Sequence, residues 1–236
     1  MKSTILSAII LTLLALGTVA AHRYGWLPQD EIGDGGSITA IAPPSGFERV
    51  AVEEGSYADW LRNLPLKGSD ARVRLYNGWP KPDQSVHYRV IDIDVGSRDL
   101  QQCADAIIRL RAEYLFSTGR RDVISFKFTN GDSADYKRWR EGWRPIVNGN
   151  DVSWEKKAAV DSSYANFHRY LETIFIYAGT WSLSRDMSKV DAGLVEIGDA
   201  FIIGGFPGHA IFVVDFARNS ETGERVMLLA QGYTPA

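Results

Sequence analysis

Two residues of this chain could form a nucleophilic site. One is its single cysteine, Cys103, and the other is His209, which opens a long apolar run. Cys103 lies near the start of a segment with helical periodicity, and the positive end of a helix favours the thiolate form that attacks carbonyl groups. His209 follows a Gly/Pro turn, where its imidazole could take the proton from a thiol. The two residue types therefore predict a Cys–His site for thiol chemistry.

A histidine that acts as a base needs a partner for its second ring nitrogen. Asp215 shares a strand face with His209, but an extended strand at ~3.3 Å per residue places it about 20 Å away. A hairpin turn at residues 219–223 would return the next strand alongside the first, with Gln231 or Gly232 opposite His209. The amide oxygen of Gln231 can accept a hydrogen bond from the ring. We therefore expect Gln231 to orient His209.

Each of these three residues also has a purely structural interpretation. Cys103 falls on the apolar stripe of its helix together with Leu100 and Ile107, and buried, inert cysteines are common. His209 could be a turn residue that bonds only to backbone, and Gln231 could be an ordinary strand end. The distance between the Cys103 sulfur and the His209 ring separates the two interpretations.

The patterning that would position these residues predicts an α+β protein, with helices packed on a mainly antiparallel sheet and a C-terminal β-meander. Residues 47–236 are expected to form a single domain. The expected helices are 56–64, 99–117, 133–143 and 161–178, and the expected strands are 72–76, 86–95, 123–129, 145–147, 152–154, 199–203, 209–217 and 225–231. In strand 86–95, Asp92 and Asp94 share one face, as either a solvated face or a metal pair, and the solvated face is favoured.

Composition narrows the function classes. Hydrophobic residues make up 45% and charged residues 23%, which is typical of a folded soluble domain. The net charge of −3 gives no basis for nucleic-acid binding. The sequence has no His-x-x-x-His or paired-Cys pattern and no phosphate-binding loop, so neither a metal nor a cofactor is expected.

The N-terminus has the order of a secretory signal peptide, expected over residues 1–21. Lys2 is followed by an uncharged apolar run, 5–16, and by small residues at 18–21. Residues 22–46, rich in Gly, Pro, Asp and Ser, are expected to be a linker. A periplasmic or secreted location follows, with membrane contact only through the signal segment. One cysteine forms no intramolecular disulfide, which fits a bacterial periplasm.

Five segments carry a resemblance to a known family: Arg98-Asp-Leu-Gln-Gln-Cys-Ala-Asp-Ala106, Leu110-Arg-Ala-Glu-Tyr-Leu115, the Phe-Thr-Asn-Gly segment ending at Gly131, Pro207-Gly-His-Ala210 and Leu229-Ala-Gln231. Through them the chain, from about residue 47 onward, resembles an exported bacterial family of unassigned function. The resemblance implies that the chain is truncated at its C-terminus, because members of that family run on past the Tyr-Thr-Pro-Ala end seen here.

A second resemblance links Gly198-Asp199, an apolar strand and Gly208-His209 to the papain-like cell-wall amidases and peptidases. It implies a papain-like fold and a peptide or peptidoglycan substrate in the cell envelope. The catalytic roles would fall on Cys103, His209 and Gln231. Two features depart from that superfamily: the interval between Cys103 and His209 is long, and Gln101-Gln102 replace the usual residues before the cysteine.

The alternative from a different class is a non-catalytic envelope protein. It would use the same fold for binding or structure, with a groove near Trp79, Trp139 and Trp143. Aromatic side chains of this kind can form a platform for a glycan or peptide, although the spacing of Trp139 and Trp143 also suits packing against the domain.

The N-terminal pattern predicts cleavage near Ala20 or Ala21 on export. Mass spectrometry of the mature protein should then find a chain that lacks the first 20 or 21 residues. An intact Met1 on a membrane-retained chain would contradict this prediction.

Overall fold

The computed structural model describes residues 2–3 and 35–236. The expected signal segment, apart from residues 2 and 3, and positions 22–34 of the expected linker lie outside this part of the chain. The helices are α2 (Tyr57–Arg62), α3 (Cys103–Ser117), α4 (Tyr136–Arg140), α5 (Tyr164–Tyr177) and α6 (Thr180–Asp186), with short 3-10 turns at Ile38–Ala40, Arg121–Val123 and Ala192–Leu194. The strands are β1 (Lys2–Ser3), β2 (Phe47–Arg49), β3 (Ser125–Lys127), β4 (Ser133–Asp135), β5 (Trp143–Asn148), β6 (Asp151–Lys156), β7 (Ser188–Lys189), β8 (Ala200–Ile203), β9 (His209–Asn219) and β10 (Arg225–Ala230).

The main sheet is organised around β9, which runs through its middle. The strand order is β10-β9-β8-β1-β7, and β2 also pairs with β9. Strands β8, β10 and β2 all run antiparallel to β9, whereas β1 is parallel to β7 and β8. The antiparallel pairing of the last two long strands, expected from their hairpin turn, is confirmed.

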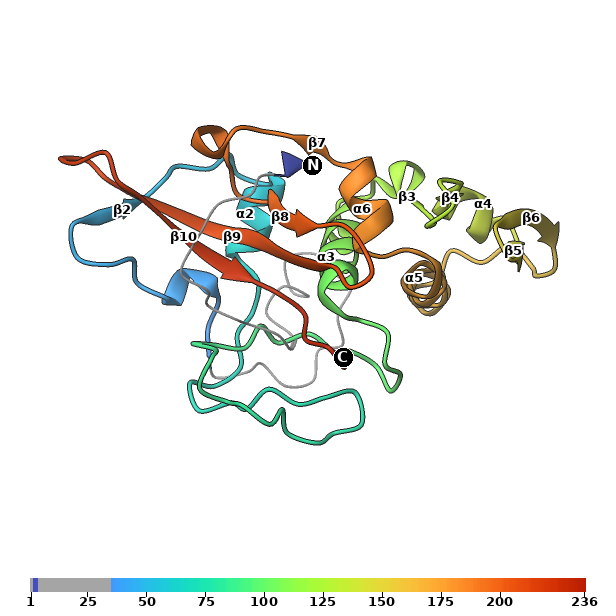
Figure 1. Ribbon diagram of the computed structural model, residues 1–236, viewed down its shortest axis with the longest axis horizontal. Coiled ribbons are helices and arrows are strands. Elements are labelled where there is room, and N and C mark those ends of the chain that lie inside the picture. The colour runs from blue at the N-terminus through green and yellow to red at the C-terminus, as the bar shows by residue number, and fades with distance from the viewer. Residues whose placement is uncertain (1, 4–34) are drawn as a thin grey trace.

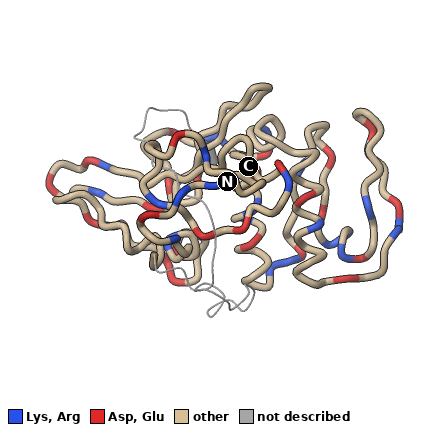
Figure 2. Tube along the Cα trace, turned by 90° about the horizontal axis from the view of Figure 1, so that it is seen from below, with Lys and Arg blue, Asp and Glu red and all other residues tan. Residues whose placement is uncertain are grey.

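Helices α2 and α3 pack on β9. Figure 1 shows them behind the sheet, while α4, α5 and the hairpins β3–β4 and β5–β6 lie at the end of the molecule opposite the β9–β10 turn. An aromatic cluster fills the space between α3 and α5. In it Phe116 stacks on Phe167 with ring centroids 4.3 Å apart, and the buried Tyr136 packs edge-on against Phe167. Basic and acidic residues are interspersed along the described part of the trace (Figure 2), and neither sign dominates this view.

The expected α+β class, with its C-terminal run of antiparallel strands, is confirmed. Helix α3 begins at Cys103, four residues later than the periodicity predicted. The expected strands 72–76 and 86–95 are wrong, because these segments make only isolated bridges at Arg74 and Ile91. One reason is visible at Val73, where the Gln84 side chain binds both the N–H and the C=O that a neighbouring strand would use. Helix α6 was not expected.

A buried carboxylate fastens two other elements to β9. Asp215 is 4% exposed and accepts hydrogen bonds from Arg49 Nε at 2.5 Å and from Arg62 Nε at 2.8 Å. Arg62 also donates to the Val50 carbonyl at 3.0 Å. Because Arg49 belongs to β2 and Arg62 to α2, this one side chain connects three elements. The Asp215 carboxylate therefore has a structural role, which agrees with the sequence argument that it does not orient His209.

Replacing Asp215 should destabilise the fold strongly. In Asp215→Asn, the Arg49 and Arg62 guanidinium groups lose the carboxylate that pairs with them, and breaking a buried pair costs about 3–5 kcal/mol. Glu172→Gln is a suitable control, since it breaks an exposed ion pair with Arg98 and should change stability by less than about 0.5 kcal/mol. Urea unfolding of both variants measures the difference. Equal, small effects would show that the Asp215 pair does not hold the fold.

Candidate active site

His209 and Gln231 are directly hydrogen-bonded. His209 Nε2 lies 2.7 Å from Gln231 Oε1. An amide oxygen can only accept, so Nε2 carries the proton and, in a neutral ring, Nδ1 is the basic nitrogen. The last residue of β10, Ala230, pairs with Phe212, so Gln231 reaches the exposed His209 ring from just beyond the strand end. The expected contact is present, and the β9–β10 register shifts by one residue at a bulge between Leu228 and Leu229.

Cys103 is the first residue of α3, directly after the N-cap Gln102. Asp105, in the first turn, accepts the Gln102 backbone N–H on Oδ2 at 3.1 Å, which fixes where the helix begins. The thiol is free and 8% exposed. Its position in the first turn puts Cys103 at the positive end of the helix, where unpaired N–H groups stabilise negative charge.

The chain after β10 connects these two parts of the site. A side chain at Gly232 would place its Cβ 2.5 Å from the Gln102 carbonyl oxygen and 3.2 Å from the Ala106 Cβ, so only glycine fits there. Further on, Thr234 donates to the Gln102 side chain at 3.4 Å, and the Ala236 N–H donates to Asp99 at 2.8 Å. The segment that carries Gln231 is therefore packed against the start of α3.

The structure thus joins Gln231 to His209 and packs the segment that follows Gln231 against the helix turn that contains Cys103. No hydrogen bond joins the Cys103 sulfur to the His209 ring. Catalytic contacts are often long in the absence of substrate and shorten when it binds.

Helix α6 supports the loop that precedes His209. Thr180, the first residue of α6, donates from its hydroxyl to the Gly205 carbonyl at 3.1 Å. A Cβ on Gly208 would lie 2.0 Å from the same hydroxyl. Sequence reasoning missed this contact. The available signal was Gly179-Thr180 followed by Leu183 and Met187, whose spacing of four is helical.

Other candidates do not gather at one place. Asp92 is buried next to Lys67 Nζ at 3.5 Å, whereas Asp94 is exposed and accepts the Gly96 N–H, so the two carboxylates do not share a face. Their segment is not the regular strand that would have aligned them. In the described part of the chain, no cluster of three or more His, Cys, Asp or Glu residues could hold a metal.

The three tryptophans of the alternative groove differ in exposure. Trp79 is 71% exposed, but Trp139 is 5% exposed and its Nε1 donates to the Asn166 side chain at 3.0 Å. Trp143 lies under the Arg138 guanidinium, 5.2 Å from its ring centre. Trp139 is therefore a core residue, and the expectation of a groove that uses its surface is wrong.

Within residues 2–3 and 35–236, no helix has the length and hydropathy to span a membrane.

Asp199 belongs to the Gly-Asp pair that contributed to the papain-like resemblance, and in the structure it stabilises a turn. It is 7% exposed, and its carboxylate accepts the Glu196 N–H at 3.0 Å in the turn before β8. Its backbone carbonyl accepts the Val213 N–H at 2.9 Å. These contacts fix the start of β8 against β9.

Asp105 is a titratable group beside Cys103 that sequence reasoning did not select. Burial raises the pKa of Asp105 to about 7, against the smaller opposite effect of the hydrogen bond from Gln102. Its second oxygen, Oδ1, is buried and has no hydrogen-bond partner among the described residues. The sequence signal was an acidic residue three positions after a helix N-cap.

The raised pKa makes stability depend on pH. Between the ordinary value of ~3.9 and about 7, the folded state keeps a proton that the unfolded state loses, so this carboxyl lowers stability as pH rises through that range. Asp105→Asn keeps an acceptor for the Gln102 N–H and cannot ionise. It should stabilise the protein at pH 8 by about 1–3 kcal/mol, with a smaller gain at pH 5.

Thermal or urea unfolding at the two pH values measures this difference. Asp59→Asn, at the corresponding position of α2, is the matched control and should show no gain at pH 8. A gain for Asp105→Asn that is equal at both pH values would contradict the assignment.

Comparison with known proteins gives one match. No curated protein and no solved structure matches the chain significantly. A family model described as a domain of unknown function matches residues 38–236, which includes Cys103, His209 and Gln231. This agrees with the resemblance to a family of unassigned function seen in the sequence. The chain therefore belongs to the family described as Domain of unknown function (4846).

Proposed function

We propose that this protein is an exported, papain-like thiol hydrolase that cleaves amide bonds of cell-envelope peptides. Cys103 is the nucleophile, His209 the general base and acid, and Gln231 the residue that orients the imidazole. The observation that carries the proposal is the 2.7 Å hydrogen bond between His209 and Gln231, on a segment packed against the first turn of α3.

The first half of the reaction is acylation. The Cys103 thiol transfers its proton to His209 Nδ1, and the sulfur attacks the carbonyl carbon of the amide. The tetrahedral intermediate then collapses: the C–N bond breaks, His209 gives the proton to the leaving amine, and an acyl-thioester remains on Cys103. Helix α3 contributes the positive end of its dipole at the sulfur.

The second half is hydrolysis of the thioester. His209 Nδ1 takes a proton from water, whose oxygen attacks the acyl carbon. The C–S bond then breaks, the carboxylic acid is released, and His209 returns its proton to the sulfur to restore the thiol. Throughout, Gln231 holds Nε2–H and so keeps Nδ1 as the nitrogen that exchanges the proton. Both half-reactions balance with water as the only co-reactant.

The class of substrate rests on the sequence. The signal-like N-terminus supports an envelope location, and the resemblance to cell-wall amidases and peptidases supports a peptide or peptidoglycan amide. His209 is exposed, and Phe206, three residues before it in the loop, is 80% exposed. A polymeric substrate could therefore reach the imidazole from solvent.

A second candidate is a non-catalytic envelope protein on the same fold. It is favoured by two observations, the 8% exposure of Cys103 and the lack of a direct hydrogen bond from its sulfur to His209. In that case the cysteine is a small core residue, and the histidine–glutamine pair fixes only the end of the sheet.

Alkylation of the folded protein distinguishes the two candidates. Because Cys103 is the only cysteine, iodoacetamide labelling reports on this thiol alone. An ordinary thiol is only a few per cent thiolate at pH 7, so a thiolate stabilised by an imidazolium should react on the order of tenfold faster. His209→Ala should remove that advantage.

His87→Gln is the matched control. It removes a histidine whose ring lies near the Ala71 carbonyl, and it should leave the labelling rate unchanged. Labelling that occurs only in denaturant, or that ignores His209→Ala, would reject the hydrolase and leave the non-catalytic candidate.

A further inference from the structure

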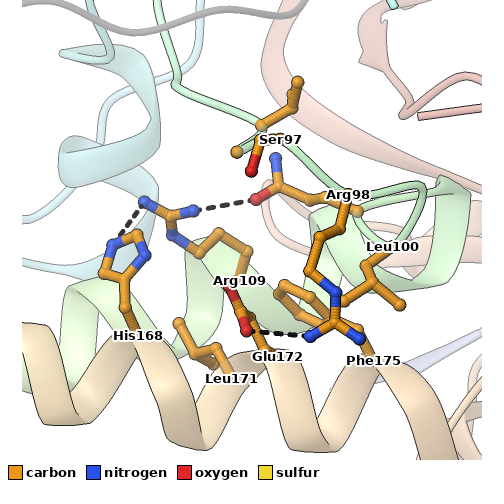
Figure 3. Close-up of a pocket in the computed structure, with 11 residues that line it drawn as sticks. Ser97, Arg98, Leu100, Arg109, His168, Leu171, Glu172 and Phe175 are labelled. Carbon is orange, nitrogen blue, oxygen red and sulfur yellow. Dashed lines mark hydrogen bonds and ion pairs between the residues drawn. The ribbon is translucent and has the colours of Figure 1, made fainter. Parts of the chain in front are cut away.

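The charged groups around the cavity in Figure 3 are paired with one another. This cavity of about 30 Å³ lies between residues 95–101, α3 and α5, and it has room for only about two water molecules. Arg109 donates from Nε to Glu113 at 2.7 Å, and Arg98 pairs with Glu172 at 3.0 Å. Each of these guanidinium groups therefore has its own carboxylate. A polar group that is open to a ligand lies instead at the start of β9.

The side chain of His209 shares a face of the main sheet with Ile203. The two residues are directly paired in the β8–β9 register, and residues opposite one another in an antiparallel pair have Cβ atoms about 4.5–5.5 Å apart on the same face. The pair Phe201–Ile211 continues this face, because side chains alternate along a strand. Both are half-buried against a small hydrophobic cluster, whereas the intervening Ala210 is in the main core. An apolar strip therefore leads up to the imidazole.

Ile203 is an apolar side chain that the protein leaves in solvent. It is 64% exposed, and it is the last residue of β8. The loop that follows lies beside α6 (Figure 1), where a Cβ on Gly204 would lie 2.2 Å from the Ser184 hydroxyl oxygen. This close packing fixes the loop whose two ends are Ile203 and His209. Contiguous apolar side chains with a polar group beside them are typical of ligand sites.

His209 has one ring nitrogen that a ligand can use. Nε2–H donates to Gln231, so Nδ1 is the acceptor of the neutral ring. Nδ1 makes no hydrogen bond to the described part of the chain, and the ring is exposed. A peptide N–H could donate to it. In the proposed hydrolase the same nitrogen protonates the leaving amine, so the amide nitrogen of the substrate has to lie beside it.

We propose that this face binds a peptide residue with an apolar side chain. The backbone N–H of that residue donates to His209 Nδ1, and its side chain packs on Ile203. A charged side chain would have to leave water for an apolar surface, which is costly, so acidic and basic residues bind more weakly. As a substrate preference, with the apolar residue on the amine side of the cleaved bond, this rests on the proposed hydrolase. The binding itself does not use Cys103.

The test is a nuclear magnetic resonance titration of the ¹⁵N-labelled protein that observes the two ring nitrogens of His209. N-acetyl-leucinamide should shift the Nδ1 signal in a saturable manner. It should bind about fivefold more tightly than N-acetylglycinamide, because part of the leucine side chain leaves water on Ile203. The absence of a saturable Nδ1 shift, or equal affinity for the two compounds, would overturn the proposal.

Ile203→Ser and Leu194→Ser are matched variants, since Leu194 is 63% exposed. Leu194 lies in the 3-10 turn whose Gly193 carbonyl accepts from Arg225, the first residue of β10, so it is at the other end of that strand from the His209 site. Ile203→Ser should abolish the preference for leucine over glycine, and Leu194→Ser should keep it. A preference that survives Ile203→Ser would contradict the proposed contact.

Alkylation of Cys103 reports on the hydrolase separately. If leucine is preferred at His209 but Cys103 labels only in denaturant, the hydrolase is rejected and the peptide-binding face stands. If Cys103 labels rapidly with the help of His209 but the titration shows no preference for leucine, the hydrolase stands and the peptide-binding face is rejected.

Discussion

The buried carboxylate of Asp215 is the constraint on which the rest of the fold depends. Placing one negative charge inside the protein is costly unless cations and donors surround it. Arg49 and Arg62 meet that requirement from β2 and α2, so both elements are fixed to β9. With β2 and β8 along one edge and β10 along the other, β9 is held over its length. Its first residue, His209, therefore has a defined position.

The site depends on a second approach, that of the chain after β10 to the start of α3. The absence of a side chain at Gly232 lets the backbone reach the Gln102 carbonyl, and this brings the Gln231 amide to His209. The same helix turn carries Cys103 and the buried Asp105. At this position the helix terminus stabilises a negative charge, whereas burial opposes it.

Much of this arrangement could be predicted from the sequence, since the long amphipathic helices and the C-terminal meander follow from periodicity. The pairing of His209 with Gln231 followed from a hairpin and the length of its two strands. The residue at which α3 begins could not be predicted in this way, because Asp105 caps the helix through a local hydrogen bond that the apolar stripe does not reveal. Segment 86–95 has β-type composition but pairs only at a bridge. Contacts that depend on small size, such as those at Gly232 and Gly208, are set by tertiary packing alone.

The central claim is that Cys103, His209 and Gln231 act as one unit, and a double-mutant cycle on thiol alkylation tests it most directly. If Gln231 acts only through the imidazole, Gln231→Leu should slow iodoacetamide labelling of Cys103 in the wild-type protein and have no effect in the His209→Ala background. If Gln231→Leu changes the labelling rate by the same factor in both backgrounds, the two residues act independently, and the account of a coupled thiol site is contradicted.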